Sequence, residues 1–197
     1  MIEVLIATKN DKKLRELKRY LKNVVARIAS LKESSGAPRI REDKSTFKGN
    51  AIKKAVIISK FTKGLVLADD SGLCVDALDG RPGVKSARFA GNNKKDHDNN
   101  AKLLKLMKAV PAGKRGARFV CAIAIADNGK VVNVVEECCN GRIADSVRGR
   151  QGFGYDPVFL VPKYNKTFGE LGLKVKDKMS HRSKALKKAR KFLRKYI

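Results

Sequence analysis

The sequence predicts an α/β protein of two lobes, in which a mixed sheet is flanked by helices and a site lies in the cleft between the lobes. Apolar residues in the first half alternate between helix-like and strand-like spacing, which is typical of α/β folds. The second half contains a strong hairpin signal, which adds paired strands to the sheet. With 197 residues, the chain fits one domain over residues 1–197 and is long enough to bury a sizeable core.

Strands and helices follow one another closely in the first half. Leu14, Leu17 and Leu21 recur at helical spacing, and Thr46 is a suitable N-cap for a second helix. The predicted segments are, in order, a strand at 2–7, a helix at 10–22, a strand at 24–31, a helix from 46 to about 61, and a short strand at 65–68.

The second half is organised around a hairpin. Asp127-Asn128-Gly129 separates two strand-like runs, and Asn-Gly favours the tight turn that paired strands need. Ala101, Leu104 and Met107 are predicted to share the buried face of a helix. The predicted segments are a helix at 97–108, strands at 117–126 and 130–137, a third strand near 141–147, and a last helix capped by Ser180.

The charge of the chain is unusual. Lys and Arg number 45 and Asp and Glu number 19, so the formal net charge is +26. The basic residues are scattered, aromatic residues make up only 6% and Trp is absent, so few rings could stack on exposed bases. We therefore expect a solvated basic surface that binds nucleic acid only by nonspecific charge.

Several classes of protein are excluded by composition. No apolar stretch approaches the ~20 residues of a membrane span. The first residues contain no basic stretch of the kind that begins a signal peptide. We therefore expect no membrane association and a cytoplasmic location. The four cysteines have no Cys-x-x-Cys spacing, so we expect buried, reduced thiols and assign them no function.

Two adjacent carboxylates, Asp69 and Asp70, follow the apolar run Leu65-Val66-Leu67. Carboxylates at the end of a buried strand are costly unless a cation binds them, and Mg²⁺ prefers such oxygen ligands. Ser71-Gly72 then predicts a tight turn. The alternative is an ordinary polar turn at a surface strand end.

A second polar segment, Thr8 to Lys13, lies where the first strand gives way to the first helix. Free backbone N–H groups and the helix dipole favour an anion there, and Lys13 adds a positive charge. An ordinary helix cap by Asn10 or Thr8 is the alternative. The Gly-Lys-Ser/Thr ending of a Walker loop is absent.

The next polar segment precedes and enters the second helix. Glu42 can reach a cation that also touches the Asp pair, whereas a surface role near the helix dipole is the alternative. Asn50 and Lys54 are four residues apart and share a helix face. A polar Asn and a charged Lys on one inward face are hard to explain as residues of a hydrophobic core.

Two further segments carry groups suited to a flat ligand. In Gly152-Phe153-Gly154-Tyr155-Asp156, glycines allow close approach, a ring can stack, and Asp156 can accept a hydrogen bond; a structural turn is the alternative. Near the start of the last helix, His181 and Arg182 project where the dipole disfavours cations, which favours a functional role.

Together these segments resemble the inosine/xanthosine triphosphate pyrophosphatase family, whose members remove deaminated purine nucleotides from the precursor pool. The resemblance extends from residue 5 to about residue 190. It rests on motifs in the family's order, namely Thr8-x-Asn10-x-x-Lys13, Thr46-Phe47-x-x-Asn50-Ala51-x-x-Lys54-Ala55, Ala68-Asp69-Asp70-Ser71-Gly72-Leu73, Pro82-Gly83-x-x-Ser86-Ala87-Arg88, Gly152-Phe153-Gly154-Tyr155-Asp156-Pro157 and Ser180-His181-Arg182.

The resemblance implies a role for each matching residue. It implies Asp70 as the general base, and Glu42, Asp69 and Asp70 as the residues that hold Mg²⁺. It also implies a set of residues that contact the purine nucleoside triphosphate: Thr8, Lys9, Asn10, Asp11, Lys12, Lys13, Lys54, Ser71, Phe153, Gly154, Tyr155, Asp156, Lys176, His181 and Arg182.

The implied reaction releases pyrophosphate from ITP, dITP or XTP and leaves the monophosphate. The resemblance also implies a homodimer, to which we expect the segment from Gly80 to Met107 to contribute. Two rivals remain: a nucleic-acid-binding protein without turnover, and a related enzyme acting on pyrimidine or other modified nucleotides.

Overall fold

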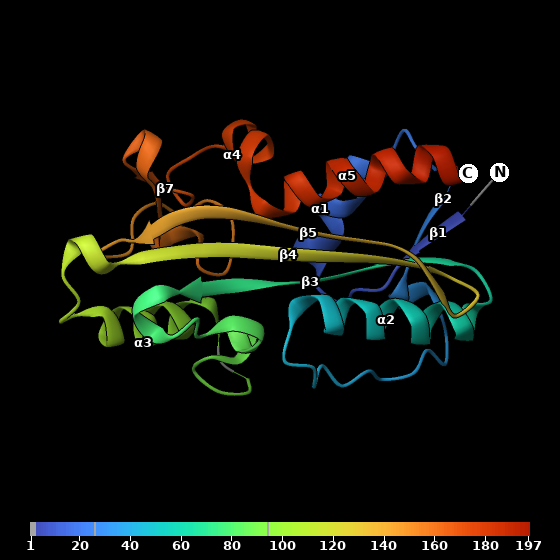
Figure 1. Cartoon of the computed structure of the whole chain (residues 1–197), viewed down its shortest axis with the longest axis horizontal. Helices are drawn as coiled ribbons and strands as arrows, with labels where there is room; N and C mark the ends of the chain where they lie inside the picture. Colours follow the sequence, from blue (N-terminus) through green and yellow to red (C-terminus); the bar gives the residue numbers. More distant parts are fainter. Residues whose placement is uncertain (1–2, 26, 94) are drawn as a thin grey trace. The chain divides into compact units, whose positions relative to one another are not determined.

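The computed structural model describes residues 3–25, 27–93 and 95–197. One residue of the strand predicted at 2–7 (Ile2) and one of the strand predicted at 24–31 (Ala26) lie outside the described residues, as do Met1 and Lys94. The helices and strands alternate as predicted (Figure 1). The elements are β1 (Glu3–Ile6), α1 (Asp11–Leu21), β2 (Arg27–Ser30), α2 (Phe47–Thr62), β3 (Leu65–Val75), α3 (Asp96–Met107), β4 (Gly116–Asp127), β5 (Lys130–Ile143), β6 (Phe159–Val161), β7 (Lys166–Thr167), α4 (Leu173–Met179) and α5 (His181–Tyr196).

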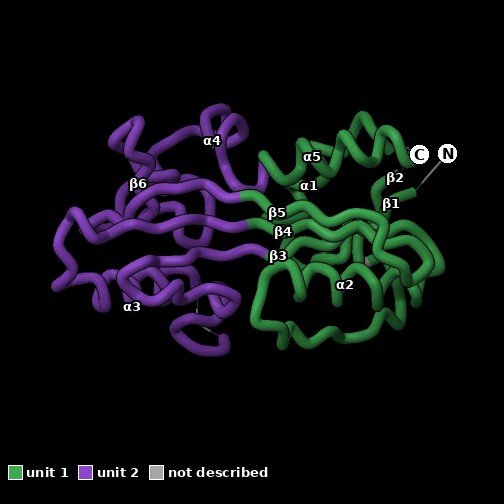
Figure 2. The backbone as a smooth tube through the Cα atoms, in the orientation of Figure 1, with its two compact units in different colours: residues 1–70, 121–137, 184–197 green, residues 71–120, 138–183 purple. Residues whose placement is uncertain are grey.

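The strands of the described chain form a seven-stranded mixed sheet in the order β2-β1-β3-β4-β5-β6-β7. β1 pairs in parallel with β2 and with β3, whereas β6 pairs antiparallel with both β5 and β7. The predicted mixed α/β fold is therefore confirmed. The chain divides into two compact units (Figure 2): unit 1 holds residues 1–70, 121–137 and 184–197, and unit 2 holds residues 71–120 and 138–183.

Unit 1 has a core between its strands and two helices. Alternate strand residues, such as Val4, Leu67 and Ile123, pack with Leu17 of α1 and Leu186 of α5. Because successive strand residues point to opposite faces, the residues between them face the other side, which α2 covers (Figure 1). Asp69 and Asp70 therefore point to different faces of the sheet.

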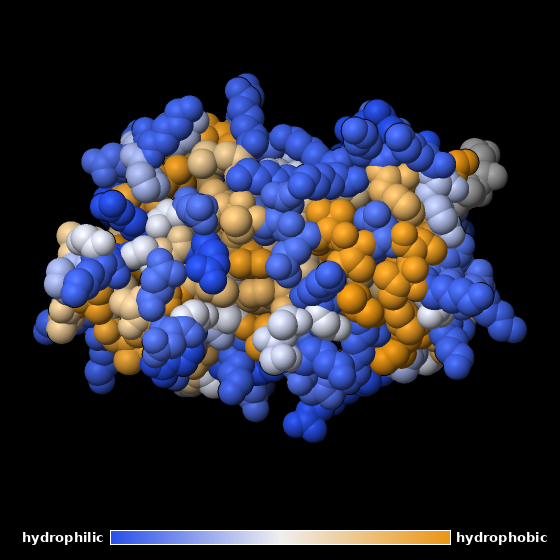
Figure 3. Space-filling model, in the orientation of Figure 1, coloured by the Kyte–Doolittle hydropathy of each residue, from blue (hydrophilic) through white to orange (hydrophobic). Residues whose placement is uncertain are grey.

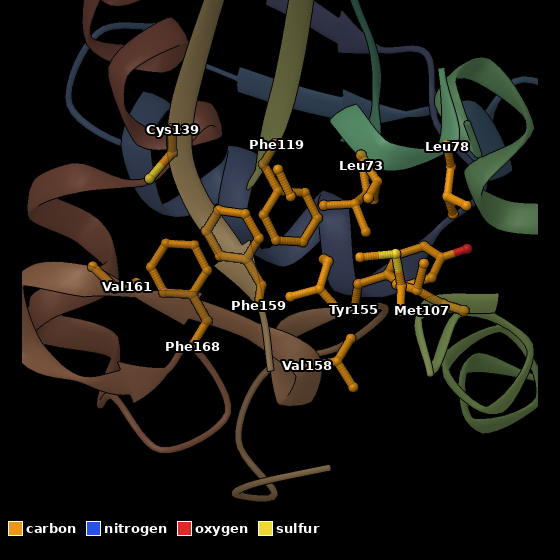
Figure 4. Close-up of a cluster of buried hydrophobic side chains, with 14 of the residues drawn as sticks. Leu73, Leu78, Met107, Phe119, Cys139, Tyr155, Val158, Phe159, Val161 and Phe168 are labelled. Atoms are coloured by element: carbon orange, nitrogen blue, oxygen red, sulfur yellow. The ribbon is translucent and has the colours of Figure 1, made fainter. Parts of the chain in front are cut away.

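Unit 2 has its own aromatic core (Figure 4). The ring of Phe119 lies 4.6 Å from that of Phe159, and the ring of Phe159 lies 5.2 Å from that of Phe168. Tyr155 is buried in the same cluster, and its hydroxyl donates to the Ser86 carbonyl over 2.9 Å.

Several local predictions are confirmed. Thr46 caps α2 by accepting a hydrogen bond from the Gly49 N–H. Asn128 and Gly129 both have positive φ, as the tight hairpin turn requires. Ser180 immediately precedes α5 and caps it, since its hydroxyl accepts a hydrogen bond from the Ser183 N–H over 3.1 Å.

Other local predictions are wrong. The third strand predicted near 141–147 does not exist, because β5 itself continues to Ile143 and the next strand is β6. On α3 the prediction fails only at Ala101, which is exposed: Met107 is buried and Leu104 packs against the core of unit 2, and the face also carries the buried residues Asn99, Asn100 and Leu103. Cys138 is also exposed rather than buried.

Candidate active site

Asp69 and Asp70 are buried within β3, with exposed residue fractions of 1% and 5%. The prediction that the strand ends at Ala68 and turns at Ser71-Gly72 is wrong, because β3 continues to Val75. β1 ends at Ile6 and pairs with β3 only from Leu65 to Leu67, so the Asp pair lies beyond this pairing, in the part of β3 that continues beside β4. A buried carboxylate needs hydrogen bonds or a cation, and both are present.

Lys13 supplies the cation for Asp69. Its Nζ lies 2.9 Å from Asp69 Oδ2. The backbone N–H groups of Lys12 and Lys13 donate to Asn10 Oδ1, so the N-terminus of α1 is capped by its own chain. The expectation of free N–H groups for an anion therefore does not hold for these two groups. In the same segment, Thr8 is half-buried, and Lys9 and Asp11 are exposed.

Lys54 and Asn50 of α2 surround Asp70. Lys54 Nζ donates to Glu42 Oε1 over 2.8 Å and to the Asp69 carbonyl over 2.5 Å, and it lies 3.8 Å from Asp70 Oδ1. Asn50 Nδ2 donates to Asp70 Oδ2 over 3.0 Å. The predicted shared face of Asn50 and Lys54 is confirmed, and both side chains point towards β3.

The charges in this cluster influence one another strongly. Burial opposes the charge of Lys54, but the carboxylates of Asp69, Asp70 and Glu42 outweigh burial, so the pKa of Lys54 lies above its ordinary value. Burial raises the pKa of Asp70, and this effect exceeds the opposite influence of Lys54 and Lys13. Asp70 is thus a carboxylate whose proton affinity is increased by its surroundings.

The three predicted Mg²⁺ ligands all offer carboxylate oxygens, the donors that Mg²⁺ prefers, and each lies beside a lysine. Glu42 and Asp70 both face the Lys54 ammonium and offer hard carboxylate oxygens, whereas Asp69 Oδ2 faces Lys13. Within the part of the chain that the structure describes, no group of three or more His, Cys, Asp or Glu side chains is arranged to hold a metal ion.

A second polar cluster lies in unit 2, around Asp156. Its Oδ2 accepts hydrogen bonds from the Phe153 N–H over 2.8 Å and from Lys176 Nζ over 2.5 Å. Gly152 has φ +79°, and a Cβ there would lie 2.0 Å from Asp156 Oδ2, so glycine is required. Lys176 belongs to the short helix α4, which extended backbone at Ser180 separates from α5.

The half-buried ring of Phe153 lies beside two cations of this cluster. Lys176 Nζ and Arg182 Cζ are 5.1 Å and 5.4 Å from the ring centroid. Arg182 Nη2 also donates to Ser71 Oγ over 2.8 Å. The His181 ring stacks on Phe119, with centroids 4.7 Å apart and an interplanar angle of 10°.

The structure thus gathers the predicted residues into two clusters. Glu42, Lys13, Lys54 and the Asp pair lie together in unit 1, and Ser71, Phe153, Asp156, Lys176 and Arg182 lie together in unit 2. Tyr155 differs, since its side chain belongs to the core of unit 2.

Sequence reasoning missed two residues that contact the Gly154 backbone. Asp96 and Asn100 of α3 bind the N–H and the carbonyl of this glycine. Their four-residue spacing near a helix start was the available signal.

Solved structures share this fold. A Ham1 protein from Coxiella burnetii is 38% identical, with a TM-score of 0.90 and coverage of 98% of each chain. A Ham1 protein from Staphylococcus aureus is 37% identical, with a TM-score of 0.89, and covers 99% of this chain and 100% of that one.

Relatives are also similar in sequence. A protein from Desulforamulus reducens named dITP/XTP pyrophosphatase is 50% identical over 192 residues, which cover 98% of this chain and 96% of the relative. A protein of the same name from Bacillus subtilis is 45% identical over 193 residues, which cover 98% of this chain and 98% of the relative.

The fold and the two clusters define a mixed α/β protein with a buried carboxylate–lysine site and an aromatic–cationic site. The sequence profile of the Ham1 family matches residues 4–192. The chain therefore belongs to the Ham1 family, and the family resemblance predicted from its motifs is confirmed.

Proposed function

We propose that this protein hydrolyses deaminated purine nucleoside triphosphates, namely dITP, ITP and XTP, to the monophosphate and pyrophosphate, and so cleanses the nucleotide pool. The carboxylate–lysine cluster of unit 1 carries the proposal, because it places an oriented carboxylate beside two cations. The names of the relatives support the substrate class.

The residues of unit 1 act on the triphosphate. Lys13 and Lys54 neutralise negative charge on the phosphates as it develops. Asp70, whose raised pKa favours proton uptake, accepts a proton from the attacking water at a carboxylate oxygen. Glu42 and Asp70 would hold Mg²⁺, which withdraws charge from the phosphates when bound.

The residues of unit 2 recognise the base. Phe153 offers a ring face for stacking beside Lys176 and Arg182. Arg182 and His181 donate hydrogen bonds to O6 of hypoxanthine or xanthine. Adenine carries an amino group there and would leave these buried donors unpaired. This mismatch lowers kcat/KM for adenine nucleotides by several orders of magnitude relative to the deaminated purines.

The test is a measurement of pyrophosphate release from dITP, ITP, XTP and the four ordinary triphosphates with Mg²⁺ present and absent. We expect a much higher kcat/KM for the deaminated purines and no turnover without the metal. Preference for a modified pyrimidine would favour the related enzymes, and binding of nucleic acid without turnover would favour the nonenzymatic rival.

We also propose a cytoplasmic homodimer. None of the helices in the described part of the chain is long and apolar enough to cross a membrane. Apolar side chains gather on the visible face of unit 1 over α2 and β5 (Figure 3). Phe61 of α2 and Val131 of β5 are 46% and 43% exposed. Leu106, in the segment expected to contribute to the interface, is also 43% exposed. Exposed apolar area of this kind suits association.

A further inference from the structure

Helix α3 holds the backbone next to Phe153 at two points. The N–H of Gly154 donates to Asp96 Oδ2 over 2.9 Å. The carbonyl of the same glycine accepts a hydrogen bond from Asn100 Nδ2 over 3.0 Å. Asp96 and Asn100 are one helical turn apart, so both side chains lie on the same face of α3. A single helix face therefore binds both polar groups of one residue.

The conformation of Gly154 makes this double contact possible. Its φ of +61° lies in the left-handed region, and a Cβ at this position would meet nothing within 4 Å among the described atoms. Glycine is therefore needed for its backbone conformation and not for space. A left-handed residue reverses the local chain direction, and the peptide groups on both of its sides are then directed at α3.

Phe153 is consequently fixed on both sides. Its own N–H donates to Asp156 Oδ2 over 2.8 Å, and the residue that follows it is bound to α3. Fixing the backbone on both sides limits the positions that the ring can take between Lys176 and Arg182. A binding group that is already in place avoids the entropy cost of ordering when the ligand arrives.

We propose that Asp96 and Asn100 are positioning residues for base recognition, which hold the Phe153 loop in the conformation that stacks on a purine. The inference rests on the proposed function. It assigns a role in ligand recognition to a helix for which the sequence predicted only a buried apolar face and a contribution to the dimer. It also explains why Asn100, which is 4% exposed, occupies the buried face of α3.

A general stabilising role of α3 is the competing explanation, and the same helix offers a matched control. Asp98 accepts a hydrogen bond from the Lys95 N–H over 2.8 Å and so caps the helix, two residues from Asp96. Asp98→Ala removes one carboxylate and weakens the start of α3 without removing either bond to Gly154. Asp96→Asn is the conservative variant, because it keeps an acceptor oxygen.

The experiment compares Asp96→Ala, Asp96→Asn, Asn100→Asp and Asp98→Ala with the unsubstituted protein. KM and kcat are measured with ITP, and the affinities for inosine monophosphate and for inorganic pyrophosphate are measured by calorimetry. Asp96→Ala and Asn100→Asp should each raise KM and weaken the binding of the monophosphate about tenfold, with kcat and pyrophosphate affinity within about twofold. Asp96→Asn and Asp98→Ala should remain within about threefold of the unsubstituted protein.

Hydrogen exchange of the Gly154 amide supplies a readout that does not depend on activity. Exchange should accelerate in Asp96→Ala and not in Asp98→Ala. An unchanged KM in Asp96→Ala, or an equal effect in Asp98→Ala, would overturn the inference while the enzyme remained active on ITP. If the unsubstituted protein hydrolyses no triphosphate, the proposed function fails and the inference fails with it. Asp96 lies at the helix start, so Asp96→Ala tests the inference even if Asn100→Asp does not fold.

Discussion

Asn50 donates a hydrogen bond from Nδ2 to Asp70 Oδ2 over 3.0 Å. Asn50 is 1% exposed, and its Oδ1 accepts a hydrogen bond from the Lys44 N–H over 2.9 Å. The amide is thus held from the loop before α2 and fixes one oxygen of the carboxylate. The other oxygen, Oδ1, faces Lys54. An oriented carboxylate of this kind is suited to accept a proton from a defined direction.

We predict that Asp70→Asn abolishes turnover and leaves the fold intact. The substitution keeps the shape of the side chain but removes the negative charge and the proposed base. The expected loss in kcat is on the order of 10²-fold or more. Steady-state kinetics and a circular dichroism spectrum test the two parts of the prediction.

Asp43→Asn is the matched control for Asp70→Asn. Asp43 lies in the loop before α2 and pairs with Lys53 Nζ over 2.8 Å, with both groups partly exposed. Its substitution should change kcat by less than about twofold. Retention of more than about a tenth of the original kcat in Asp70→Asn would exclude Asp70 as the base.

The raised pKa of Asp70 predicts a pH-dependent difference in stability. Burial raises this pKa above its value in the unfolded chain, so the folded state resists ionisation. The contribution of Asp70 to stability is complete below its unfolded pKa and is lost as the pH rises through its folded pKa. Asparagine does not titrate. Without metal, Asp70→Asn should therefore gain in stability relative to the original protein between about pH 3 and pH 7.

Denaturant unfolding with a chelator present measures this difference. If the stability of Asp70→Asn relative to the original protein fell from acid to neutral pH, the result would contradict the direction of the Asp70 pKa shift. Addition of Mg²⁺ at neutral pH should stabilise the original protein and leave Asp70→Asn little changed, because a ligand that binds only the folded state stabilises it.

The sequence predicted the elements whose signals are local. The Asn128-Gly129 turn and the Thr46 cap depend on a few neighbouring residues, and both lie where they were predicted. The extension of β3 past Asp69 and Asp70 was missed, because Ser71-Gly72 is typical of a turn. β1 pairs with β3 only as far as Leu67, so the continuation of the strand depends on β4, the neighbour on its other side, which is distant in the sequence.

In the candidate site, too, features with a local sequence signal were predicted and features that depend on distant residues were missed. Residue types and spacing identified the carboxylates and lysines, and the structure brings Glu42, Lys54 and Asp70 together. The buried face of α3 was predicted only in part, because apolar spacing identified Leu104 and Met107 but cannot reveal a buried amide. Asn99 and Asn100 are buried because they bond to backbone groups of Ala90 and Gly154, which only the fold brings to them.

We predict that base choice depends on Arg182. It is 4% exposed and lies beside the Phe153 ring. Arg182→Ala should lower kcat/KM for ITP more than for ATP and so narrow the ratio between them. Kinetics with both substrates measure the ratio. Lys187→Ala removes an exposed positive charge from the same helix and should leave the ratio unchanged. An equal loss on both substrates would make Arg182 a phosphate-binding or structural residue.

We predict a homodimer whose stability increases with salt. Each chain carries a formal net charge of +26, so two copies repel one another. Exposed charges farther apart than the Debye length of about 8 Å are largely screened at physiological ionic strength, whereas apolar contacts are not weakened by salt. The dimer should therefore persist at physiological salt and dissociate as salt is removed. Sedimentation velocity across a salt series tests both statements. A monomer at every ionic strength would refute the dimer, and a dimer that becomes tighter as salt falls would refute the electrostatic argument.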